Sequence, residues 1–150
     1  SAPQLVLGIA FGCGVPMAFA AETGFVPFIG WVIFAIAIIW ALIYDTYYAM
    51  VDRDDDLKLN VKSAAIFFGH YDLLFIGIFQ CLMILLLFLM AQLAALGPWV
   101  YISIMISVLL MIYHQWLTRN RNREACFRAF RHNHYIGMTI FIGIILHYQT

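Results

Sequence analysis

The chain has 150 residues, and its eight basic and eight acidic side chains give a formal net charge of zero. Hydrophobic residues make up 65% of the chain and charged residues only 11%, whereas a soluble domain is about 45–50% apolar and about 25% charged. So few charged side chains cannot coat a water-soluble globule of this length, which excludes a soluble fold. We expect an integral membrane protein, with residues 1–150 in one membrane domain.

Five long uncharged segments run through the chain. A helix needs about 20 residues to cross a bilayer, and these segments lack the alternation that membrane β-strands show. We therefore predict an all-α, polytopic bundle of five transmembrane helices. The predicted helices cover residues 5–21, 28–44, 73–96, 99–117 and 135–148.

The connections between these segments are of two kinds. Residues 22–27 and 95–98 form short turns with Gly and Pro, whereas residues 45–72 and 118–134 carry every Lys and Arg of the chain. Five crossings place the two charged connections on one side, which the positive-inside rule makes cytoplasmic. The N-terminus should share that side. A bacterial inner membrane is the expected location, with the mitochondrial inner membrane as the alternative.

Five of the eight acidic residues lie within twelve positions after the second apolar segment. At 100° per residue, Asp52 lies about 20° to one side of Asp45 and Asp56 about 20° to the other. Asp55 is offset by about 80°, and Asp54 points the opposite way. If helix geometry persists, three carboxylates form one column. Such neighbours repel one another unless a cation neutralises them.

Mg²⁺ prefers carboxylate oxygens and substrate phosphates, so the column suits a diphosphate held through magnesium. Arg53, Lys58 and Lys62 could bind the same phosphates through charge-assisted hydrogen bonds. A plain solvated loop is the simpler explanation of such a charge block. A calcium loop is excluded, because Leu57 and Ser63 stand where an EF-hand needs Gly and a bidentate Glu.

The remaining polar candidates have simpler explanations. His132 and His134 could suggest a metal pair, but no carboxylate or Cys lies near them in sequence, so a polar loop is expected. The arginines of the second charged connection set topology and contact anionic lipid, and a second role is to guide a diphosphate substrate. These arginines are Arg119, Arg121, Arg123, Arg128 and Arg131.

Residues 44–69 read YDTYYAMVDRDDDLKLNVKSAAIFFG. This string resembles the second Asp-rich motif of the UbiA family of intramembrane prenyltransferases, and within the family it is most similar to the 4-hydroxybenzoate polyprenyltransferases of ubiquinone biosynthesis. The resemblance continues through REACFRAF at 123–130 and NHYIG at 133–137, which are similar to the family's last loop and final helix. One departure is Asn60, where the family usually has Gly; Asn tolerates left-handed backbone geometry.

The resemblance implies a magnesium-dependent enzyme that transfers a polyprenyl group from its diphosphate to the ring of 4-hydroxybenzoate. The residues that match the metal motif are Asp45, Asp52, Asp55 and Asp56. Asp52 and Asp56 are expected to be the central catalytic pair, because residues one helical turn apart can share a metal. The three basic residues named with the column are expected to bind substrate. The expected partners are the two substrates and the lipid bilayer, with no nucleic acid.

The family has nine helices and two Asp-rich motifs, and only the second motif is recognisable in this chain. We therefore expect the chain to be the C-terminal portion of a longer protein, with the N-terminal half of the bundle as its missing partner. Alone it should be inactive. Two alternatives stay open. One is a UbiA-type enzyme for another aromatic acceptor, and the other is a non-catalytic membrane scaffold or remnant whose Asp run only solvates a loop.

Overall fold

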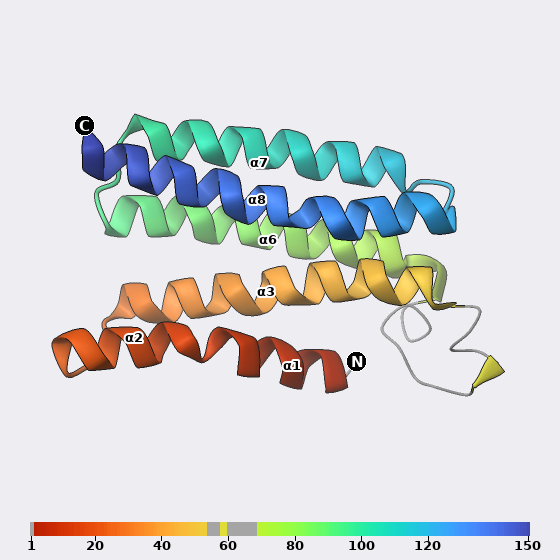
Figure 1. The fold of residues 1–150 in the computed structure, drawn as a ribbon, viewed down its shortest axis with the longest axis horizontal. Helices are drawn as coiled ribbons and strands as arrows, with labels where there is room; N and C mark the ends of the chain where they lie inside the picture. Colours follow the sequence, from red (N-terminus) through yellow and green to blue (C-terminus); the bar gives the residue numbers. More distant parts are fainter. Residues whose placement is uncertain (1, 54–57, 60–68) are drawn as a thin grey trace.

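The computed structural model describes residues 2–53, 58–59 and 69–150, which form a bundle of long helices lying side by side (Figure 1). All regular structure in these residues is helical, which confirms the predicted all-α class. In chain order the elements are α1 (Ala2–Gly12), α2 (Gly14–Thr23), α3 (Phe28–Val51), the short 3₁₀ helix η1 (Gly69–Tyr71), α6 (Asp72–Leu93), α7 (Pro98–Leu117) and α8 (Arg123–Gln149).

Four helical stretches of the described residues are long and apolar enough to cross a membrane. They are Leu5–Thr23, Phe28–Val51, Gly69–Leu93 and Pro98–Leu117. The first stretch comprises most of α1 and all of α2, which break at Cys13. Helix α8 is long enough but more polar, because its first half carries Arg and His side chains. The fifth crossing, predicted at 135–148, lies within α8 and stays a prediction.

Two charged connections are shorter than the sequence predicted. Helix α3 continues through Val51 instead of ending near residue 44. Helix α8 begins at Arg123, where the side chain of Asn122 accepts hydrogen bonds from the N–H groups of Glu124 and Ala125. Such an N-cap satisfies donors that would otherwise have no partner, and it starts the helix before the apolar run.

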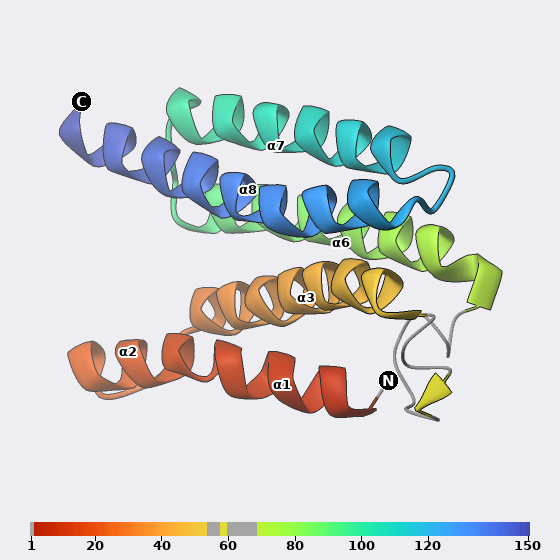
Figure 2. The same cartoon turned by 45° about the vertical axis from the view of Figure 1, so that its right-hand side comes forward.

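Helix α3 lies at the centre of the bundle. It packs against α1, α2, α6 and α8, while α7 packs against α6 and α8 (Figures 1 and 2). The side chains between α3, α6, α7 and α8 exclude solvent and form the core, which includes Ile43, Ile76, Leu87, Ile104 and Ile136.

The described ends of both charged connections lie at one end of the bundle. In Figure 1 the end of α3, the start of α6, the α7–α8 connection and the N-terminus share this end, and the C-terminus lies at the other. The two short turns also lie at that other end. This arrangement matches the predicted order of crossings. Which end faces the cytoplasm stays a prediction.

Helices α7 and α8 are in close contact at Gly143. A Cβ atom added there would clash with the hydroxyl of Ser103 and would lie 2.9 Å from the Ser103 Cβ and 3.0 Å from the carbonyl oxygen of Trp99. The backbone oxygen belongs to α7 and cannot rotate away. Small residues permit such close helix approach in membranes.

Gly143→Ala should therefore lower the free energy of unfolding by about 1–3 kcal/mol, the usual cost of overpacking a core. The measurement is unfolding of the detergent-solubilised chain against SDS mole fraction. Gly14→Ala is the matched control, because a Cβ added at Gly14 meets no described atom within 4 Å. Equal effects of the two substitutions would contradict the predicted clash.

Candidate functional site

The end of α3 brings the first residues of the Asp-rich motif to the charged end of the bundle. Because the helix is continuous through Val51, Asp45 and Asp52 lie on nearly the same face. Asp52 is the C-cap residue, and its N–H donates to the carbonyl oxygen of Tyr48 at 3.2 Å. Asp45 lies two turns earlier, about 10 Å away along the helix axis.

Several predicted site residues lie outside the described residues. Asp55, Asp56 and Lys62 are among them, as is Asn60. Lys58 is described and exposed. The catalytic pair of Asp52 and Asp56 and the four-carboxylate metal set therefore stay predictions.

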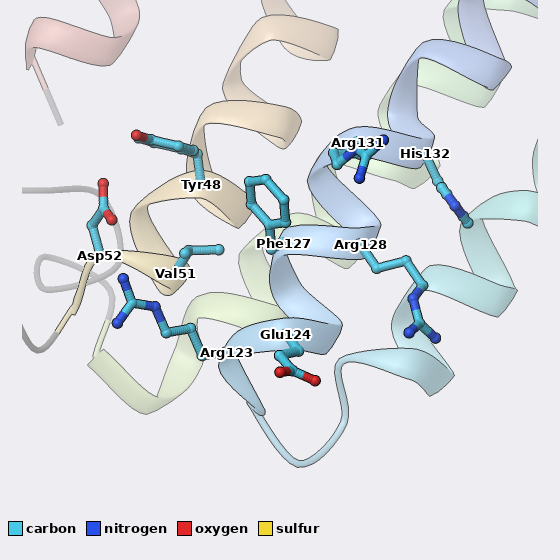
Figure 3. A pocket seen from close by; sticks show the side chains of 9 residues that line it. All are labelled: Tyr48, Val51, Asp52, Arg123, Glu124, Phe127, Arg128, Arg131 and His132. Carbon is cyan, nitrogen blue, oxygen red and sulfur yellow. The ribbon is translucent and has the colours of Figure 1, made fainter.

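Asp52 lines a cavity of about 730 Å³ between the end of α3 and the first three turns of α8. One wall comes from α3 and its cap, and the other comes from α8 (Figure 3). In Figure 3 the Arg123 side chain extends from α8 toward Asp52. The lining residues are Tyr48, Val51, Asp52, Arg123, Glu124, Phe127, Arg128, Arg131 and His132.

The α8 wall is one face of a helix. Arg123, Phe127 and Arg131 recur every four residues, and Glu124 and Arg128 form a second such row beside them. The opposite face of this part of α8 carries Cys126 and Ala129, which are fully buried. The sequence predicts a loop at these arginines, with membrane topology as their main role. Their three- and four-residue spacing, with buried positions between, was the signal of a helix.

Three arginines give the cavity a basic character. Burial and the nearby Arg128 guanidinium lower the pKa of His132, so its imidazole is neutral at pH 7 and adds no charge. Two carboxylates, those of Asp52 and Glu124, line the same cavity as the three guanidinium groups. A phosphate-bearing ligand suits the guanidinium groups.

The donor set fits Mg²⁺ bound together with a phosphate. A carboxylate beside a diphosphate is repulsive unless a cation lies between them, and Mg²⁺ typically takes one or two protein carboxylates with the remainder from phosphate and water. The described residues contain no group of three or more His, Cys, Asp or Glu that could hold a metal alone. Asp45 does not line the cavity. Its Oδ2 is buried without a hydrogen-bond partner among the described residues.

Arg53 reaches a second acidic residue. Its guanidinium is ion-paired with Asp72 and donates to the Gly69 carbonyl oxygen at 3.0 Å. Asp72 also accepts from Arg121 at 3.0 Å. The sequence analysis gave no role to Asp72 beyond the end of a loop. An Asp at the first position of a 22-residue apolar helix was the available signal, because a carboxylate there needs a partner.

Comparison with known proteins agrees with this architecture. The model of the UbiA prenyltransferase family matches residues 1–142. The solved structure of a digeranylgeranylglyceryl phosphate synthase superposes with a TM-score of 0.80 over 96% of this chain and 51% of its own, at 21% sequence identity. At that identity the structure supports the fold alone.

These features define a class of protein: a helical membrane bundle with a basic cavity at one end that also contains carboxylates. More particularly, the chain belongs to the UbiA prenyltransferase family. It is 54% identical over 145 residues to a protein of Providencia stuartii and 49% identical over 146 residues to one of Aeromonas salmonicida. Both are named 4-hydroxybenzoate octaprenyltransferase. The alignments cover 97% of this chain and 50% of each relative, and they match the C-terminal portion.

Arg128→Gln should weaken magnesium-dependent binding of inorganic diphosphate by about tenfold, because a charge-assisted hydrogen bond is lost. The measurement is calorimetric titration of the detergent-solubilised chain with and without Mg²⁺. Arg119→Gln is the matched control, since Arg119 lies over the Trp116 ring and does not line the cavity. Equal weakening by both substitutions would indicate a general charge effect and contradict the assignment of the cavity.

Proposed function

We propose that this chain supplies the second Asp-rich half of a magnesium-dependent enzyme that transfers a polyprenyl group from its diphosphate to the ring of 4-hydroxybenzoate. One observation carries the proposal: in a chain of the UbiA family, Asp52 and three arginines of α8 line the same cavity. The names of the relatives support the acceptor. The chain spans about half of their length, so the complete enzyme needs a further part.

The reaction breaks the bond between the allylic carbon and the diphosphate oxygen, and the bonding electrons leave with the diphosphate. The allylic carbon then bonds to the ring carbon beside the hydroxyl, and that ring carbon loses its proton. Mg²⁺, when bound, neutralises the leaving diphosphate. We assign its carboxylate ligands to Asp52 and, with it, Asp56.

The arginines of α8 act on the same charge. Arg123, Arg128 and Arg131 donate hydrogen bonds to the diphosphate oxygens, where negative charge grows as the bond breaks. Groups that bind this charge more strongly in the transition state than in the substrate accelerate the reaction. Lys58 and Lys62 are retained as phosphate ligands in this proposal, whereas Arg53 is not, because its guanidinium is ion-paired with Asp72 and does not line the cavity.

Aromatic rings line the same cavity as the arginines. Tyr48 and Phe127 line it, and Phe130 lies behind them with its ring centroid 5.0 Å from that of Tyr48. The face of an aromatic ring attracts a cation, so these rings can stabilise an allylic cation while they exclude water. We assign them this role in the transfer.

The test is a chimera that joins the N-terminal half of the Providencia stuartii relative to this chain. With polyprenyl diphosphate and Mg²⁺, membranes containing the chimera should incorporate labelled 4-hydroxybenzoate into lipid. This chain alone should give no product. Asp52→Ala should lower the rate by about 100-fold or more, the usual cost of losing one charge-stabilising group.

Glu22→Gln is the control in the chimera, because Glu22 is exposed in α2 at the opposite end of the bundle. It should leave the rate unchanged. If an inserted chimera makes no product while the Providencia stuartii enzyme does, the acceptor assignment fails. Product from another hydroxylated aromatic acid would then support a different UbiA-type enzyme, and full activity of Asp52→Ala would remove Asp52 from the mechanism.

A further inference from the structure

Asp72 is a charged residue with no solvent exposure. Its carboxylate is ion-paired with both Arg53 and Arg121, and its Oδ1 accepts a hydrogen bond from the N–H of Leu73 at 2.6 Å. A buried carboxylate is tolerated only with such partners, because the loss of its hydration is otherwise uncompensated. Asp72 therefore depends on the two arginines, whose own side chains are partly exposed.

The two arginines come from different connections of the chain. Arg53 also donates to the carbonyl oxygen of Gly69 at 3.0 Å, and Arg121 donates to that of His70 at 2.7 Å. Arg53 just after α3, the helix η1, the start of α6 and the α7–α8 connection are thus held together at one carboxylate. We call Arg53, Asp72 and Arg121 the loop clamp.

The backbone of Arg121 supports a specific role for the clamp. Its φ of 54° lies in the left-handed region, which a non-glycine residue adopts uncommonly. Such a conformation persists where the surrounding contacts determine it. The N–H of Arg121 donates to the Thr118 carbonyl oxygen at 2.9 Å, and its side chain reaches Asp72.

Each arm of the clamp adjoins one wall of the cavity. Arg53 directly follows Asp52, which lines the α3 wall. Arg121 directly precedes Asn122, the N-cap of α8, and Arg123 follows as the first lining residue of the α8 wall. A single carboxylate thus fixes the ends of both walls relative to each other.

We propose that Asp72 is a positioning residue that sets the spacing between Asp52 and the arginines of α8, and thereby the affinity of the cavity for a magnesium-bound diphosphate. This proposal rests on the proposed function only in its choice of ligand. It requires the clamp to act on the cavity and not merely to stabilise the bundle, so its test needs readouts that separate these two effects.

Cys126 is a built-in reporter of the α8 wall. Its thiol is fully buried one turn into α8, and burial raises its pKa to about 11, with a further contribution from Asp72. Both properties slow reaction with a maleimide, which needs an accessible thiolate. If the clamp opens, the start of α8 should loosen and Cys126 should react faster.

The experiment compares two proteins in nanodiscs, and both carry Cys81→Ser. One is otherwise wild type, and the other also carries Asp72→Asn. Asp72→Asn keeps the side-chain shape but removes the negative charge with which both arginines are paired. We expect maleimide labelling of Cys126 to accelerate by about tenfold or more, since removing one partner of a buried ion pair is strongly destabilising locally. Labelling of Cys13, in the break between α1 and α2, should stay as in the wild type.

The second readout is magnesium-dependent binding of inorganic diphosphate, measured on the same proteins. Asp72→Asn should weaken it by about tenfold, by the loss of aligned charge-assisted contacts, and Asp72→Glu should recover part of that affinity. Glu22→Gln removes the same charge from an exposed position and should change neither readout. Both measurements need no turnover, so they decide this proposal even if the chimera fails to transfer a prenyl group.

Three results would overturn the proposal. One is unchanged Cys126 labelling and unchanged diphosphate affinity in Asp72→Asn. Another is faster labelling of both Cys13 and Cys126, which would show that Asp72 stabilises the whole bundle without a specific effect on the cavity. The third is loosening of α8 with full diphosphate affinity, because the clamp would then not govern the spacing that binding needs.

Discussion

The exclusion of ionic groups from hydrocarbon determines where this protein can do chemistry. A charged side chain in the middle of a bilayer is costly, and a polar group there needs a partner inside the protein. In the described residues, Thr46 and Ser107 meet this need by donating to the carbonyl oxygen four positions earlier in their own helices. The basic residues lie instead in and beside two connections. Cavity and clamp therefore lie together at that end of the bundle.

The number and order of helices were predictable because uncharged runs of membrane length leave few alternatives. The start of α8 was not, because residues 123–134 mix Arg and His with small and apolar residues, and a search for uncharged segments passes over such an amphipathic stretch. The N-cap Asn122 and the buried positions Cys126 and Ala129 show what determines where α8 begins. Short-range hydrogen bonds to Asn122 begin the helix, and the packing of its buried residues stabilises it up to the apolar segment.

The candidate site was predictable in part. The motif singled out Asp52, and the structure places Asp52 at a cavity. The opposing wall was missed, since arginines that set membrane topology and arginines that bind phosphate have the same sequence signal. Asp72 could not be paired from sequence, because its partners lie 19 residues before it and 49 residues after it. Only the antiparallel return of α7 brings Arg121 beside the start of α6.

The same separation orders events during synthesis. Arg53 is made before α6 and Asp72 is the first residue of α6, whereas Arg121 follows only after α6 and α7 have been added to the chain. Contacts between residues distant in sequence form late, because the intervening chain must first be ordered. The Asp72 carboxylate can therefore gain its second arginine only once α7 has returned to the start of α6. The cavity is complete only when α8, which follows α6 and α7 in the chain, has also been made.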